Sequence, residues 1–85
     1  MKVKFNSPKA RMDFANLSKS NKAIAEYMKD DTHEAVNYNN GDICLVDCEG
    51  VEIIVNDDGN ISENGRGWYV TVFMNERPYF HIEGE

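Results

Sequence analysis

The sequence contains no long apolar run. Its most hydrophobic stretches, such as residues 69–74, are far shorter than the roughly 18 residues that a membrane-spanning helix needs. Residues 1–12 include several basic side chains but no apolar segment of the kind that a secretory signal peptide uses. We therefore expect a chain that is located in the cytoplasm.

Cysteine is scarce, and its spacing argues against a cross-link. Cys44 and Cys48 are four residues apart, which in an extended segment separates their α-carbons by roughly 13 Å. A disulfide needs a separation below about 7 Å, so two buried, reduced thiols are expected. With His33 and His81 as the remaining candidates and no Cys-x-x-Cys pair, the sequence predicts no zinc site.

Motifs for catalysis are also absent. No phosphate-binding loop, dinucleotide fingerprint or nucleophile elbow is present. His33 lies near Asp31 and Glu34, so it could act as a base with a carboxylate partner, but the preferred interpretation is that it offsets local negative charge. The serines lie in cap or loop contexts: Ser7, Ser18, Ser20 and Ser62. We expect no enzyme activity, no catalytic residue and no cofactor.

Residues 56–67, NDDGNISENGRG, form the segment that most resembles a ligand site. In an EF-hand the glycine at position 6 would be Gly59. Positions 1 and 12 would then be Ile54 and Gly65, neither of which offers a side-chain oxygen. The Asp-Gly and Asn-Gly pairs instead favour a long hairpin connection. An irregular calcium loop is the less favoured alternative, and we assign no metal ligand.

The chain is short enough for one domain, residues 1–85, with a thin stability margin. Ser7 and Pro8 predict a helix start. One helix over residues 8–29 would be about 33 Å long, longer than a typical strand, so a break is expected within residues 18–21. The predicted apolar seam comprises Ala10, Phe14, Leu17, Ile24 and Met28, with Asn21 among them.

Strand patterns follow the helical segment. Residues 34–38 and 42–46 flank an Asn-Asn-Gly sequence that is typical of a type I′ hairpin. Further strands are expected at residues 51–55, 68–74 and 78–82, with the last two joined by a short connection. The predicted fold class is α+β: a small antiparallel β meander of about five or six short strands, with the N-terminal helical segment packed on one face.

Charge is divided unevenly along the chain. Residues 1–29 contain seven Lys and Arg against two Asp and Glu, which gives +5, whereas residues 30–85 contain two against thirteen, which gives −11. We therefore expect a basic part over residues 1–31 and an acidic β part over residues 32–85. On one continuous helix a basic stripe would form from Arg11, Lys22 and Lys29, with Lys19 further round. It is either an ordinary solvated face or a contact for phosphates or acidic proteins, and a helix break would disrupt it.

The last two predicted strands alternate. Trp68, Val70, Val72 and Met74 share one face, and Phe80 and Ile82 are expected to join them toward the helix. One helical segment covers one face of such a sheet. The opposite face would then present an exposed row of Tyr69, Phe73, Tyr79 and His81. Such a row can stack bases or anchor a protein, and ordinary cross-strand pairing is the alternative.

The acidic surroundings favour a protein partner, because a region at −11 repels phosphates. The first hypothesis is a non-enzymatic acidic binding protein that inhibits or regulates a basic, nucleic-acid-handling partner protein. Its size and acidity are compatible with virus-encoded inhibitors of host factors. Tyr69, Phe73 and Tyr79 would anchor the contact, together with His81, while Asp57, Asp58 and Glu63 would attract the partner.

Two alternatives stay open. The chain could bind RNA, using the aromatic strands for stacking and a basic surface for phosphates that comprises Arg11, Lys19, Lys22 and Lys29. A version with protein at one end and RNA at the other is also physically compatible with the charge division. Alternatively, the chain could be a structural homodimer that packs through the helix seam.

Overall fold

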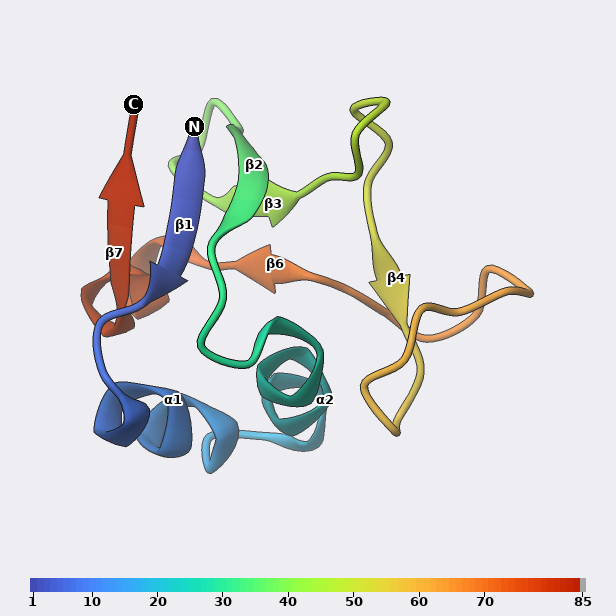
Figure 1. The fold of residues 1–85 in the computed structure, drawn as a ribbon, viewed down its shortest axis with the longest axis horizontal. Coiled ribbons are helices and arrows are strands. Elements are labelled where there is room, and N and C mark those ends of the chain that lie inside the picture. Colours follow the sequence, from blue (N-terminus) through green and yellow to red (C-terminus); the bar gives the residue numbers. More distant parts are fainter. Residues whose placement is uncertain (85) are drawn as a thin grey trace.

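The chain forms one strand and two helices before the rest of the sheet. β1 spans Lys2–Phe5, α1 spans Pro8–Ala15 and α2 spans Lys19–Met28. The computed structural model, which describes residues 1–84, packs these helices against an antiparallel sheet (Figure 1). The α+β prediction is confirmed.

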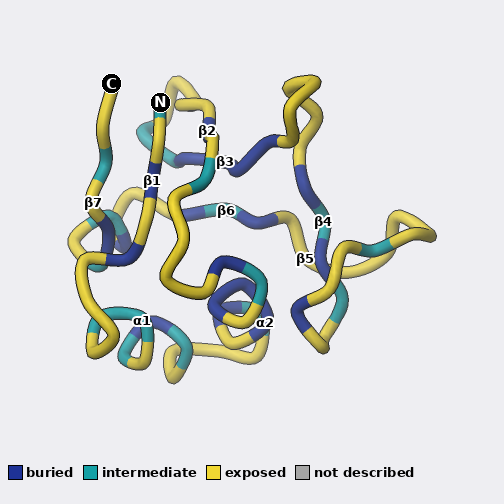
Figure 2. Tube along the Cα trace, viewed as in Figure 1, coloured by how far each residue is buried: buried dark blue, intermediate teal, exposed yellow. Residues whose placement is uncertain are grey.

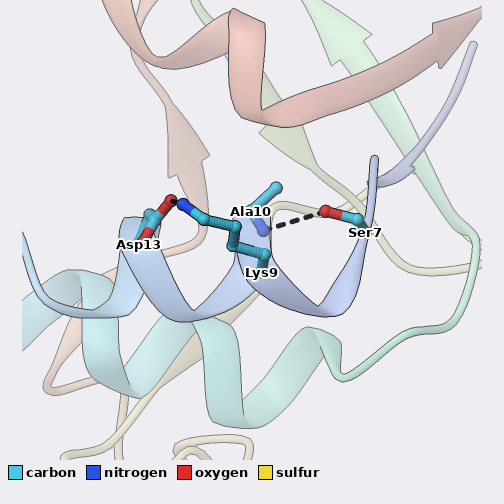
Figure 3. Close-up of polar contacts among 4 residues, drawn as sticks. All are labelled: Ser7, Lys9, Ala10 and Asp13. Atoms are coloured by element: carbon cyan, nitrogen blue, oxygen red, sulfur yellow. Dashed lines mark hydrogen bonds and ion pairs between the residues drawn. The ribbon is translucent and has the colours of Figure 1, made fainter.

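Serine caps start both helices, and the break between them spans residues 16–18, so it overlaps the predicted break only at Ser18. Ser7 Oγ accepts a hydrogen bond from Ala10 N at 3.0 Å, and Pro8 occupies the first turn (Figure 3). Along the same helix Lys9 Nζ lies 2.7 Å from Asp13 Oδ2, and this contact raises the pKa of Lys9. α1 ends at Ala15, with Asn16 as its C-cap, and Ser18 caps α2 by accepting from Asn21 N at 3.1 Å. The predicted division of this segment into two helices, each short enough to lie beside short strands, is therefore confirmed.

Five strands form the main sheet in the order β6-β3-β2-β1-β7, with every pair antiparallel. A second, two-stranded sheet pairs β4 with β5, matching Ile54 to Tyr69 and Val55 to Trp68. The remaining strands are β2 (His33–Asn37), β3 (Ile43–Leu45), β4 (Ile54–Val55), β5 (Trp68–Tyr69), β6 (Thr71–Val72) and β7 (Phe80–Glu83). β1 and β7 are adjacent, so both ends of the described chain lie together (Figure 1).

The hairpin between β2 and β3 is present, but its predicted turn type is wrong. Gly41 N donates to Tyr38 O at 3.0 Å, and Gly41 has a φ of 90°. A type I′ turn needs a positive φ at both central residues, and within residues 1–84 Lys29 is the one non-glycine with positive φ. Asn40 Oδ1 instead accepts from Asp42 N at 3.0 Å. This local bond favours an ordinary turn followed by a left-handed glycine.

The predicted hairpin between residues 68–74 and 78–82 is wrong. A 3₁₀ helix, η1 (Met74–Tyr79), replaces the short connection, and β7 begins at Phe80. Pro78 lies inside η1 and has no N–H to donate to a ladder. The chain therefore leaves the sheet after β6 and returns at the opposite edge beside β1.

The core lies between the helices and the sheet, and most of the seam contributes to it. Phe14, Ile24 and Met28 are buried, whereas Leu17 is 54% exposed in the loop between the helices, so its predicted core position is wrong (Figure 2). Cys44 is buried, which raises the pKa of its thiol. Cys48 was also expected inside, but it is exposed because it lies in the turn after β3. Both thiols are free, as predicted.

Candidate functional site

Three aromatic side chains lie exposed along the short strands β5 and β6 and just beyond them. Trp68 is 37% exposed, Tyr69 55% and Phe73 53%. Val70 and Val72, which alternate with Tyr69 and Phe73, are fully buried and hold this part of the chain on the core. The predicted burial of Trp68 and Met74 is wrong: both are exposed, Trp68 on the two-residue strand β5 and Met74 at the start of η1 rather than in a continuous strand.

These aromatic residues form one side of a groove, which we call the aromatic groove. Its volume is about 320 Å³, within the range of roughly 300–1,000 Å³ that is common for ligand clefts. α2 forms the opposite wall, and Figure 1 shows the edge strand β6 between β3 and that helix. The lining residues are Ser20, Asn21, Ile24, Gly67, Trp68, Tyr69, Thr71 and Phe73.

Asp57 links the long loop to both walls of the groove. The Trp68 indole Nε1 donates to Asp57 Oδ1 at 2.9 Å, and Lys19 Nζ lies 3.1 Å from Asp57 Oδ2. The hydrogen bond from Trp68 and then the contact with Lys19 lower the pKa of Asp57 below its ordinary value. Asp57 therefore holds the Trp68 ring in place and fixes the loop against the start of α2.

Gly59 provides a second attachment of the loop to α2. It is buried with a φ of 79°, and a Cβ at this position would lie 2.5 Å from Glu26 Cβ and 3.1 Å from Ala23 O. Only glycine allows this approach. Residues 56–67 are thus the hairpin connection that the sequence predicted, joining β4 to β5, and their first half packs against the helix.

A buried carboxylate lies behind the groove. Glu76 is 8% exposed, and it accepts hydrogen bonds from Asn21 Nδ2 at 2.7 Å and from Phe73 N at 3.1 Å. Ser18 Oγ in turn donates to Asn21 Oδ1 at 3.0 Å. Each oxygen of the Glu76 side chain therefore accepts a hydrogen bond, one from each groove wall.

The sequence reasoning missed Glu76 because it placed this residue in a strand connection. One signal was available, since glutamate three residues after a helix N-cap is the pattern of a capping box. Phe73 occupies the cap position, where serine or threonine is usual, so the pattern was hidden.

The predicted row of four exposed residues does not form. Tyr69 and Phe73 border the same groove, but the Tyr79 ring packs edge-on against Phe14, with 6.0 Å between ring centroids. His81 lies on β7 at the other edge of the sheet, where its Nε2 is 2.9 Å from Glu83 Oε1. The cause is η1, which separates the strands that were expected to be neighbours.

Asp58, Glu63 and His33 lie outside the aromatic groove. Asp58 and Glu63 are exposed on the long loop, and Glu63 borders an open polar basin that Asn56 and Arg66 also line. His33 Nε2 lies 2.8 Å from Met28 O at the end of α2, so this histidine contacts the helix terminus rather than Asp31 or Glu34. Within residues 1–84, no three His, Cys, Asp or Glu side chains are grouped to hold a metal ion.

The basic residues do not form one stripe. The helix break places Arg11 on α1, where its Nε donates to Ala25 O at 3.0 Å and joins the two helices. Lys19 is paired with Asp57, while Lys22 and Lys29 are exposed on or beside α2. The stripe prediction is therefore wrong, because it required one continuous helix.

Some of the positive charge of the first part lies against the acids of the second. Lys2 Nζ lies 3.8 Å from Glu34 Oε1, in addition to the contact between Lys19 and Asp57. At the β7 edge His81, then Lys4 and Lys2, lower the pKa of Glu83. These contacts neutralise part of the basic surface, while the chain as a whole keeps its net charge of −6.

Comparisons with protein-family models, with curated proteins and with solved structures find no match for this chain. In residues 1–84 no helix combines the length and the apolar character that crossing a bilayer requires.

Proposed function

We propose that this chain is a non-enzymatic binding protein that docks on a basic protein partner through the aromatic groove and inhibits or regulates that partner. Trp68, Tyr69 and Phe73 are the anchors. The observation that carries the proposal is their position, because all three exposed rings lie on one side of a groove. The buried Val70 and Val72 hold their backbone on the core, and the chain has a net charge of −6.

Aromatic residues on rigid backbone are favourable anchors, because they bury a large area at a small entropy cost. Here Trp68 is fixed further by its hydrogen bond to Asp57. The excess of acidic residues would speed the approach of a basic partner. A cytoplasmic location is part of the proposal and is supported by the two free thiols.

RNA binding is less well supported. Aromatic rings can stack bases, but Lys19, the predicted basic residue that lies beside the groove, is paired with Asp57. Homodimer formation through the helix seam has lost its basis, because Phe14, Ile24 and Met28 are buried in the chain's own core.

Affinity capture from the source cell, followed by nuclease treatment, tests the proposal. We expect a protein that stays bound after nuclease and that binds the Tyr69→Ala/Phe73→Ala variant more weakly. Loss of a central aromatic anchor costs on the order of 2 kcal/mol, or about thirtyfold in Kd. Met12→Ala is the matched control, since Met12 is exposed on α1 away from the groove. Retention of the partner by both variants alike would contradict the proposal.

A further inference from the structure

The hydrogen bonds of Val70 show which edge of residues 68–72 is occupied. Val70 N donates to Ile53 O, and Val70 O accepts from Leu45 N, both at 3.0 Å. The two backbone groups of Val70 therefore point to the same side, where β4 covers β5 and β3 covers β6.

The neighbouring residues must point the other way. Successive residues in an antiparallel strand direct their N–H and C=O groups to alternate sides. Tyr69 and Thr71 therefore direct theirs away from β4 and β3. β6 ends the five-stranded sheet and β5 ends the two-stranded sheet within the described chain. Both residues line the aromatic groove, so this open strand edge faces it.

We infer that the aromatic groove binds an extended, lysine- or arginine-bearing segment of the partner protein, which adds as a further strand along Tyr69–Thr71 beside α2. This inference rests on the proposed function and specifies its binding mode. Strand addition satisfies open backbone groups, and pockets on alternate residues provide selectivity. A helical occupant would satisfy its own backbone and leave the Tyr69 and Thr71 groups without partners.

The positive charge of the occupant follows from the groups around the groove. The buried Glu76 carboxylate is bonded to Asn21 and Phe73, which both line the groove. In the loop above Trp68, residues 56–67 contain three acids and one arginine. Asp57 is paired with Lys19, but the exposed Asp58 and Glu63 outnumber Arg66 and leave this loop acidic. A cationic side chain on the added strand would be attracted toward the loop, whereas an acidic segment would be repelled.

The occupant's other side chains would be apolar. Alternate residues of a strand point to opposite faces, so every second side chain of the segment would contact Ile24 and the rings of Tyr69 and Phe73. The segment expected to bind therefore alternates basic and apolar residues.

A blocked seven-residue peptide that alternates lysine and valine is the probe. The measurement is amide hydrogen exchange by NMR, together with chemical-shift titration. We expect the Thr71 amide to exchange about tenfold more slowly when the peptide is saturating. The amide of Ile82 is the matched reference, because Ile82 lies on the edge strand β7 at the other end of the sheet, and its exchange should stay unchanged.

Two control peptides and two protein variants make the result specific. A peptide in which glutamate replaces lysine should bind at least tenfold more weakly, and so should the lysine peptide carrying N-methyl groups on alternate residues, which removes the donors that a ladder needs. The Tyr69→Ala/Phe73→Ala variant should weaken binding of the original peptide by about tenfold, with Met12→Ala unchanged.

Other outcomes overturn the inference. Protection at Ile82 instead of Thr71, equal binding of the N-methylated peptide, or equal binding of the acidic peptide would each do so. A shift of the groove resonances by a single-stranded RNA oligonucleotide, with none from the lysine peptide, would identify nucleic acid as the occupant and reject the inference. If strand addition fails while partner capture still depends on Tyr69 and Phe73, the proposed function stands and only its binding mode is wrong.

Discussion

The two ends of the sheet have opposite surface chemistry. At the β7 edge, His81 is paired with Glu83, and Lys2 and Lys4 lie beside them on β1. Charged side chains protect an edge strand from unwanted pairing. At the β5–β6 edge, exposed aromatic rings border a groove instead. Charged side chains thus protect the β7 edge, whereas the β5–β6 edge presents aromatic rings, and this contrast supports the proposed docking at the aromatic groove.

Alanine substitution of a glycine at each edge should give the largest difference in unfolding free energy. A Cβ on Gly67, just before β5, would lie 2.1 Å from Val55 O at a φ of 133°. Gly67→Ala must therefore displace β5 or β4, and we expect a loss of unfolding free energy of roughly 3 kcal/mol or more. Gly84→Ala, beside β7, meets its nearest atom at 3.5 Å and should cost about 1 kcal/mol. Urea denaturation of both variants measures the contrast, and equal losses would contradict it.

Substitution of Glu76, behind the groove, and of Glu83, on β7, should give the next largest difference in stability. Glu76→Ala leaves Asn21 Nδ2 and Phe73 N without their acceptor at a buried position, which should cost about 2–3 kcal/mol. Glu83→Ala removes an exposed contact with His81 and should leave stability almost unchanged. Thermal unfolding followed by circular dichroism compares them. A Glu76→Ala protein as stable as the parent would show that this carboxylate does not hold the groove walls together.

Acid titration should reveal a smaller difference between Asp57, beside the groove, and Glu83, on β7. The pKa values of Asp57 and Glu83 are both lowered, by Trp68 and Lys19 in the first case and chiefly by His81 in the second. A lowered folded-state pKa stabilises the fold above the unfolded value, and this contribution is lost as pH falls through the folded value. The transition of Asp57 should therefore lie below its ordinary pKa of 3.8.

The single tryptophan provides the readout, because Trp68 donates to Asp57. Trp68 fluorescence should change as Asp57 is protonated, and Asp57→Asn should abolish the change while Glu83→Gln leaves it intact. A transition that persists in the Asp57→Asn protein would mean that another group controls the tryptophan.

Local rules predicted much of the fold. Ser7 and Pro8 marked the start of the first helix, and the Asp-Gly and Asn-Gly pairs marked the long connection, since each acts through bonds or backbone angles within a few residues. Alternation also identified Val70 and Val72 as core residues. These features depend on contacts that are close in sequence.

The errors concern contacts between distant residues. Glu76 turns the chain through bonds to Asn21 and Phe73, and no local pattern could reveal the contact with Asn21. That turn moved Tyr79 and His81 away from Tyr69 and Phe73. Two of the four residues predicted to share an exposed face, Tyr69 and Phe73, therefore border the groove, together with Trp68, whose exposure was not predicted.

Partner affinity, measured for variants at both sheet edges, decides whether the partner docks at the aromatic groove. The protein captured after nuclease treatment would be titrated calorimetrically with the parent chain, with Tyr69→Ala/Phe73→Ala and with His81→Ala/Glu83→Ala. We predict a Kd raised by about thirtyfold or more for the aromatic variant and changed by less than about threefold for the β7 variant. Equal affinity of the aromatic variant and the parent, or a loss confined to the β7 variant, would contradict the account.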